Sequence, residues 1–387
     1  MSLTQKSVHQ LPGAAVEPSS SYRSSGDDVT AARVGPAQLA SSAAVRCKAA
    51  TERTGAKPGR IPVLDFPKGV LVLVMVLYHW LNYFVGSGGS FYIYLRFLPP
   101  SFICISGFLI SHVYLSKYRI TDARLRRRLA IRGLKILGIF VLLNAVAGEL
   151  IPDQRAKSIF SNFSLSNLTS IYVTGNFAGQ RSAAFTILVP ISYLLILAAG
   201  LLILSRFCKY IFHIATALCL LGICVLSLYG LKSGILELLT IGLVGVSAGY
   251  IPIHKINAVL RHPYALVSAY LCYVVAITIY DVPYLLQVVG VCLTLMLIYW
   301  LGEISGEANA ISRTIVLLGK YSLLGYIVQI AILQLLRRGS RYVTPGLPKL
   351  GGSLLCAIGL TVIAIEVTDR ARKRVPLVDA MYTSVFL

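Results

Sequence analysis

Long apolar segments alternate with short polar segments along most of the chain. Each apolar run has roughly the length that crosses a bilayer as a helix, about 17–25 residues, and none shows the strict alternation of a β-strand. The ten runs cover residues 69–85, 97–115, 134–150, 183–204, 210–229, 234–251, 264–280, 284–301, 314–336 and 351–367. The pattern predicts an all-α protein, a polytopic transmembrane helix bundle of about ten spans.

Polar segments flank this bundle on both sides. Residues 1–59 are rich in Ser, Ala and Gly and contain no continuous apolar stretch, so we expect a disordered cytoplasmic tail. Residues 60–368 form the predicted membrane domain, and residues 369–387 form a predicted basic cytoplasmic tail.

The composition supports the membrane assignment. Charged residues make up 13% of the chain, about half the usual share of a soluble domain, and the mean hydropathy is +0.74. The net charge of +21 would suggest a nucleic-acid partner in a soluble protein. Here the cations gather in alternate loops, as the positive-inside rule requires. We therefore predict both termini inside, a multi-pass location in the plasma (inner) membrane, and no nucleic-acid partner.

The first apolar segment carries two ionisable residues. Asp65 is a suitable N-cap for a helix, Lys68 follows in the first turn, and His79 comes eleven residues after Lys68. At about 1.5 Å of rise per residue, His79 lies about 16 Å deeper and on the same face as Lys68. An ionisable group at this depth is costly and is a functional-site candidate. The alternative is a histidine that is hydrogen-bonded within the bundle.

This geometry suits a long, thin, anionic donor such as an acyl-CoA. Its phosphates would stay at the basic rim while its thioester reaches His79. A histidine there is suited to act as a general base or to accept the acyl group itself. The eight cysteines form no CxxC pair, and we expect no metal site.

Three segments resemble the integral-membrane acyltransferases, namely acyltransferase family 3 and the related heparan-α-glucosaminide N-acetyltransferase and glucan succinyltransferase families. The segment from Asp65 to His79 is similar to the first-helix signature, with Lys68 where the family usually has Arg. The Ser106-Gly107-Phe108 motif resembles one in the second span. The segment 318–330 is similar to an element near the end, with Gln329 where many members have His.

The resemblance implies an acyltransferase that uses acyl-CoA, most simply acetyl-CoA, and modifies a hydroxyl or amine of a saccharide or glycolipid. By the resemblance, His79 is the catalytic residue and Ser106 and Gly107 line the site. The donor phosphates would meet a set of cations, Lys68, Arg124, Arg127, Arg128 and Arg132. For Gly107 the alternative is that it only allows close helix packing.

Other ionisable residues lie in or beside the apolar segments. Arg96, at the outer edge of the second span, would face the acceptor or only the interface. Either Glu149 or Glu237 would orient His79 or an acceptor hydroxyl.

Two other classes of function remain open. A transporter or flippase for a lipid-linked or small anionic solute would use several ionisable residues along one path. A non-catalytic membrane scaffold would tolerate replacement of both Lys68 and His79.

Overall fold

The computed structural model describes residues 62–85, 91–115, 122–150, 169–175, 185–208, 210–280, 283–305, 309–340 and 347–386, with some side chains at helix ends left out. The chain divides into two units, Met1–Pro58 and Gly59–Leu387, and the described residues all belong to the second. The predicted cytoplasmic tail, residues 1–59, lies outside the described residues.

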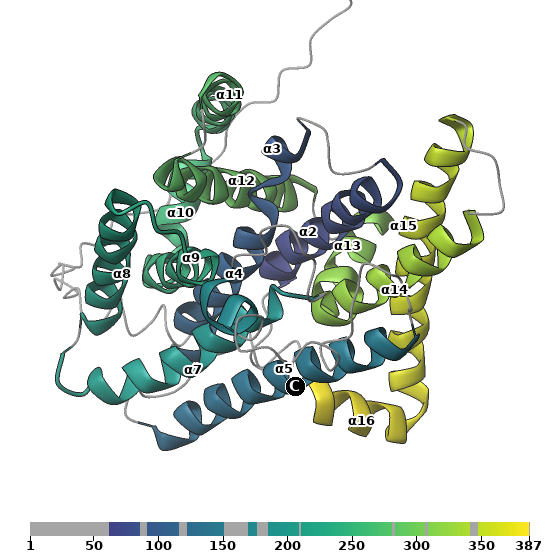
Figure 1. Cartoon of the computed structure of the whole chain (residues 1–387), viewed down its shortest axis with the longest axis horizontal. Helices are drawn as coiled ribbons and strands as arrows, with labels where there is room; N and C mark the ends of the chain where they lie inside the picture. The colour runs from purple at the N-terminus through teal and green to yellow at the C-terminus, as the bar shows by residue number, and fades with distance from the viewer. Residues whose placement is uncertain are drawn as a thin grey trace, which may run out of the picture. The chain divides into compact units, whose positions relative to one another are not determined.

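The secondary structure of the described residues is helical throughout (Figure 1). The α-helices are α2 (Pro62–Trp80), α3 (Phe91–Leu95), α4 (Leu98–Leu109), α5 (Ala123–Leu150), α7 (Leu188–Leu204), α8 (Ile211–Leu228), α9 (Gly234–Ala248), α10 (Ile253–Leu260), α11 (Pro263–Ile279), α12 (Tyr284–Ser305), α13 (Ala310–Lys320), α14 (Ser322–Ser340), α15 (Leu347–Arg374) and α16 (Pro376–Phe386). Three short π-helical segments are η1 (Leu81–Val85), η2 (Ile110–Leu115) and η3 (Ser170–Thr174).

Several helices have the length and composition of membrane spans. Within the described part of the chain, six qualify individually: Leu64–Val85, Tyr92–Leu115, Ala123–Val146, Ile211–Leu228, Tyr284–Ser305 and Gly351–Arg374. Two bent pairs, α9 with α10 and α13 with α14, raise the number to eight if each is one span. Leu218 and Leu221 of α8 are each 61% exposed, as lipid-facing side chains would be. The prediction of an all-α membrane bundle agrees with these features, whereas the count of ten spans and the orientation stay predictions.

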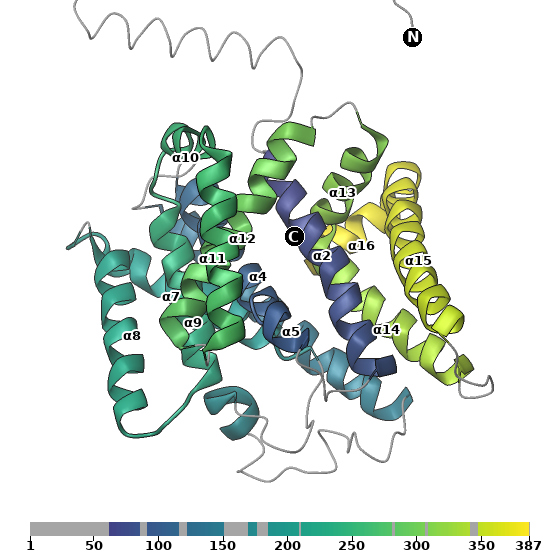
Figure 2. The same cartoon turned by 90° about the horizontal axis from the view of Figure 1, so that it is seen from above.

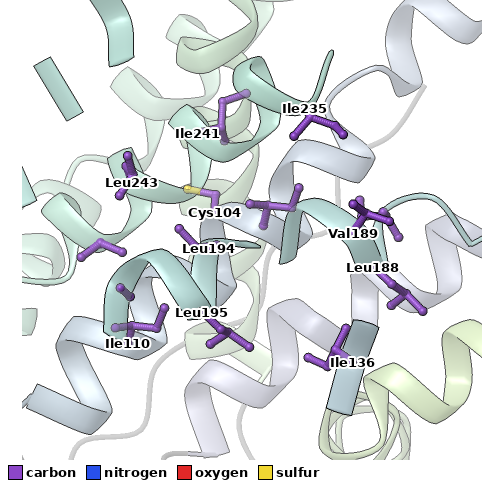
Figure 3. Packing of buried hydrophobic residues seen from close by; sticks show 14 of the residues in the cluster. Cys104, Ile110, Ile136, Leu188, Val189, Leu194, Leu195, Ile235, Ile241 and Leu243 are labelled. Carbon is purple, nitrogen blue, oxygen red and sulfur yellow. The ribbon is translucent and has the colours of Figure 1, made fainter. Parts of the chain in front are cut away.

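The main apolar core lies where α4, α7 and α9 pack together. Figure 3 shows Cys104 of α4, Leu194 of α7 and Leu243 of α9 within one buried cluster. The backbones of α4 and α9 touch, because a Cβ atom on Gly107 would overlap the carbonyl oxygen of Gly242. Small residues at such crossings let membrane helices approach closely.

A second close crossing joins α2 to α13. A Cβ atom on Gly69 would overlap the carbonyl oxygen of Ile315, and one on Gly319 would overlap the carbonyl oxygen of Asp65. Asp65 therefore lies beside the end of α13, and Gly69 beside its middle. The lack of a side chain at Gly69 and Gly319 lets α13 cross the first turns of α2 in close contact.

The α2–α14–α15 seam is a three-helix contact that runs along α2. At one level, the side chains of Val72 and Ile365 flank Gly325. At the next, Val76 and Trp80 share a buried cluster with Leu333 of α14 and Ala357 of α15. Because residue numbers rise together in α2 and α14 and fall in α15, α14 is parallel and α15 antiparallel to α2 (Figure 2).

The structure corrects two predicted segments. The segment after residue 117, predicted as a basic loop with a span from 134 to 150, is helical from Ala123 onward in α5. Arg is a good helix former, Leu125 and Leu129 bury one face of this stretch, and the Asp122 carboxylate accepts a hydrogen bond from the backbone N–H of Arg124. These contacts make the first turns of α5 a stable part of the helix.

The second correction concerns the predicted span 314–336. The helix breaks at Tyr321, and α13 and α14 meet at a bend of 93°. Tyr321 is buried and its hydroxyl donates to a carboxylate oxygen of Asp369, 2.7 Å away. Gly319, Lys320 and Ser322 interrupt the apolar pattern at this point, whereas the long apolar stretches on both sides predicted one continuous span.

Candidate functional site

His79 lies near the end of α2, inside the bundle. Its Nε2 atom is buried, and its ring centroid is 6.1 Å from that of Tyr326 in α14. Tyr326 is buried in turn, and its ring packs edge-to-face on Phe185 at 5.8 Å. Tyr78 completes the surroundings, with its ring 5.3 Å from the His79 ring. The imidazole thus lies between aromatic rings of α2 and α14.

Lys68 forms an ion pair with Asp65 in the first turns of α2. Asp65 is 5% exposed, and it lies within the helix, because α2 begins at Pro62. The predicted N-cap role of Asp65 is therefore wrong, and its carboxylate instead neutralises Lys68. This pairing leaves Lys68 less suited to bind a phosphate than the sequence suggested.

Cations gather along one face of α5. A pocket of about 300 Å³ is lined by Arg124, Arg127, Arg128, Ile131, Arg132 and Lys135. Their spacing of three or four residues places them on one side of the helix. We call these residues the α5 basic face. Arg132 is held in position, since its guanidinium donates to the hydroxyl of Tyr114.

Ser106 and Gly107 take part in local helix contacts. The Ser106 hydroxyl donates to the carbonyl oxygen of Phe102 at 2.8 Å. Gly107 lies against the backbone of Gly242, so its close-packing role is observed directly.

None of the contacts described for the remaining predicted residues reaches His79. Arg96 is exposed between α3 and α4. The backbone carbonyl of Glu237 accepts a hydrogen bond from the hydroxyl of Tyr284 at 2.9 Å. The side chain of Glu149 lies outside the described residues. Glu237 lies in the first turn of α9.

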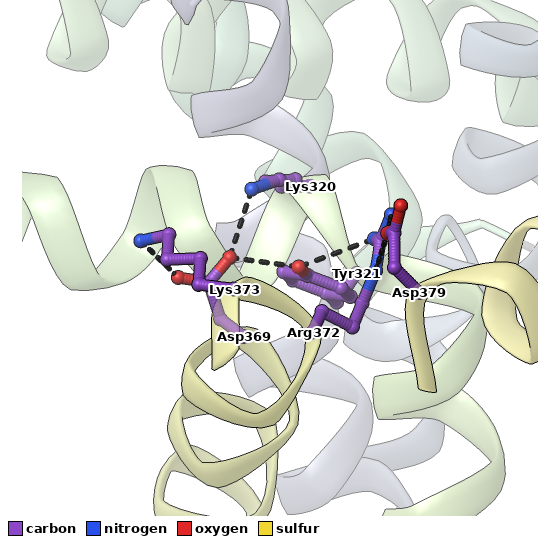
Figure 4. Close-up of polar contacts among 6 residues, drawn as sticks. All are labelled: Lys320, Tyr321, Asp369, Arg372, Lys373 and Asp379. Atoms are coloured by element: carbon purple, nitrogen blue, oxygen red, sulfur yellow. Dashed lines mark hydrogen bonds and ion pairs between the residues drawn. The ribbon is translucent and has the colours of Figure 1, made fainter. Parts of the chain in front are cut away.

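One polar group in the structure was not predicted. We call it the C-terminal cluster; it consists of Lys320, Tyr321, Asp369, Arg372, Lys373 and Asp379 (Figure 4). Asp369 accepts from Lys320 at 2.8 Å and pairs with Lys373 at 2.6 Å. The spacing of Asp369 and Lys373, four residues apart on one helix, was the available signal.

Gln329 is the other residue that sequence reasoning did not assign. It is 0% exposed, and both of its amide atoms are buried without a hydrogen-bond partner among the described residues. It lies three residues after Tyr326 on α14, and the Tyr326 ring is the one that contacts His79. Two sequence signals were available: a polar residue in an apolar segment, and a position where many members of the resembling families have His.

The chain matches no family model, no curated protein and no solved structure. The resemblance to membrane acyltransferases therefore depends on the three sequence segments alone.

Proposed function

We propose that this protein is a membrane acyltransferase that moves an acyl group, most simply acetyl, from acyl-CoA to a hydroxyl or amine of a saccharide or glycolipid. The observation that carries the proposal is the α5 basic face, a pocket lined by cations. Guanidinium groups bind phosphate oxygens through paired hydrogen bonds, and CoA presents several phosphates. The proposal includes ten spans with both termini inside.

The α5 basic face binds the donor phosphates in this proposal. Lys68 contributes less, because its ammonium already pairs with Asp65. Arg132 helps to fix the site through Tyr114, which connects α5 to the end of the second span.

His79 acts on the other end of the donor. As the acceptor oxygen attacks the thioester carbonyl carbon, His79 takes the hydroxyl proton, and the carbon–sulfur bond breaks. The proton then passes to the CoA thiolate, which leaves an ester and free CoA. The buried Nε2 atom and the aromatic surroundings suit this role, because they exclude water that would hydrolyse the thioester.

The experiment measures acetyl-CoA binding and acetyl transfer by purified protein in detergent, with a panel of saccharide acceptors. We expect His79→Ala to bind acetyl-CoA as wild type does and to lose transfer. His112→Ala is the matched control. His112 of η2 stacks on Phe108 of α4, and the variant should keep acetyl transfer. Wild type that folds but binds no acetyl-CoA would overturn the proposal. Full transfer by His79→Ala would remove His79 from the reaction.

One observation favours a transporter as the second candidate. The two bent pairs, at 98° between α9 and α10 and 93° between α13 and α14, are of the kind that forms midplane substrate sites in transporters. Uptake of radiolabelled anionic solutes into proteoliposomes tests this alternative. Uptake by protein that neither binds nor uses acetyl-CoA would favour it.

A further inference from the structure

Two residues near Tyr326, one on the same helix and one in contact with its ring, each carry a local free-energy cost. The first is Gln329, whose amide is fully buried without a hydrogen-bond partner among the described residues. The second is Phe185, which packs on the Tyr326 ring and has a φ of 58°. Positive φ is rare and strained for an aromatic residue. Strain of this kind is often found at functional sites.

The position of Gln329 follows from the α2–α14–α15 seam. Gly325, Gln329 and Leu333 are four residues apart and share one face of α14. Since Gly325 and Leu333 both contact α2 and α15, Gln329 lies between them on the same face. Thr361, at the corresponding level of α15, is also 0% exposed. Its hydroxyl donates to the carbonyl oxygen of Ala357 at 2.7 Å.

Thr361 and Gln329 are both buried, but they differ in whether their polar atoms are hydrogen-bonded. Thr361 satisfies its hydroxyl within its own helix, so its burial costs little. Gln329 has two donor hydrogens and an acceptor oxygen, and a buried polar group left without a partner costs about 1–3 kcal/mol. An apolar side chain of the same size would avoid this cost. Gln329 therefore lowers the stability of the α2–α14–α15 seam, and a functional role explains its presence better than packing does.

We propose that the Gln329 amide binds the carbonyl oxygen of the acyl group during transfer. This inference rests on the proposed function, and it names the residue that contacts the reacting carbonyl. Gln329 lies one turn from Tyr326, whose ring contacts the His79 ring. An N–H donor at that place stabilises the negative charge that develops on the carbonyl oxygen as the acceptor attacks. His79 handles the proton, and Gln329 holds the oxygen.

The test replaces Gln329 with Met, which has a similar length and no hydrogen-bonding amide. We expect the thermal unfolding midpoint to stay equal or rise, and the affinity for acetyl-CoA to stay within about twofold of wild type, because the α5 basic face is intact. The kcat of acetyl transfer should fall about 100-fold, as when a single donor to such an oxygen is removed. Gln329→Leu is a second apolar replacement that should behave in the same way.

Thr361→Val is the matched control at the same level of the seam, and we expect its kcat to stay within about twofold of wild type. Two results would overturn the assignment of Gln329. One is a kcat near wild type in Gln329→Met and Gln329→Leu. The other is a clear loss of stability in both, which would show that the amide is bonded within the protein. Failure of the proposed function is distinct, because wild type itself would then show no acetyl transfer.

Discussion

Two basic parts of the chain look alike in the sequence and differ in the structure. The α5 basic face presents Arg124, Arg127, Arg128, Arg132 and Lys135 along one pocket, and the described residues of its lining include no acidic one. The C-terminal cluster contains three cations, Lys320, Arg372 and Lys373, and each of them pairs with Asp369 or Asp379. One region concentrates positive charge, and the other uses it to join helices.

The difference shows what a basic segment can do in a membrane protein. In the C-terminal cluster, Asp369 joins α13 to α15, and the Arg372–Asp379 pair joins α15 to α16. These contacts hold the C-terminal helix in place. In the α5 basic face, like charges repel one another at a cost that an anionic ligand would relieve. Acidic residues within the group, rather than the number of cations, distinguish the C-terminal cluster from the described lining of the α5 basic face.

The largest effect should come from Asp369→Ala in the C-terminal cluster. Asp369 is 5% exposed, and its loss leaves Lys320, Tyr321 and Lys373 without their shared acceptor. Removing one partner of a buried ion pair costs about 3 kcal/mol, measured by denaturant unfolding in mixed micelles. Asp379→Ala is the matched control and should cost about 1 kcal/mol, because that side chain is 51% exposed. Equal losses in the two variants would contradict the structural role given to burial.

The second effect concerns ligand binding at the α5 basic face. We expect Arg127→Ala combined with Arg128→Ala to weaken acetyl-CoA binding by about 2 kcal/mol, or about thirtyfold. Stability should stay the same, because both side chains are exposed. Calorimetric titration measures the affinity.

Arg370→Ala serves as the control for this pair, since Arg370 is an exposed arginine of α15 outside the pocket. It should bind acetyl-CoA as wild type does. An equal loss of affinity in Arg370→Ala would show that the donor responds only to the overall positive charge.

A smaller effect is expected from salt. The Debye length falls from about 10 Å at 0.1 M to about 3 Å at 1 M, so the exposed cations of the α5 basic face are screened. Raising NaCl from about 0.1 to about 0.5 M should weaken acetyl-CoA binding about fivefold. The unfolding free energy contributed by Asp369, taken as the difference between wild type and Asp369→Ala, should change little over the same range. Donor affinity that does not depend on salt would argue against phosphate binding on α5.

Much of the fold was accessible from hydropathy, and its exceptions have physical causes. Long apolar segments need internal backbone hydrogen bonding in lipid, and so they predict helices. Hydropathy did not indicate the extension of α5 to Ala123, because arginines there form the outer face of a helix. Apolar residues on both sides of the break at Tyr321 concealed it, and the Tyr321 hydroxyl donates there to Asp369, 48 residues away.

The candidate site was only partly predictable for the same reason. His79 was identified because a histidine in an apolar helix is unusual wherever it packs. Lys68 and Asp65 are three residues apart, so their ion pair was a local possibility at helical spacing. The contact of His79 with Tyr326, and the isolation of the Gln329 amide, depend on helices far apart in the sequence.

The smallest expected effect comes from Glu366→Ala. This variant removes a carboxylate that forms an ion pair but is not buried, and so it can be compared with the buried Asp369. Glu366 pairs with Arg370 on the same helix as Asp369, but the two side chains are 47% and 65% exposed. An exposed pair at this spacing contributes about 0.4 kcal/mol. Denaturant unfolding should therefore separate Glu366→Ala from Asp369→Ala severalfold, although both remove one carboxylate from one end of α15. If the two variants lost the same stability, the net charge at the end of α15 would determine the stability of this region, rather than the contacts of the C-terminal cluster.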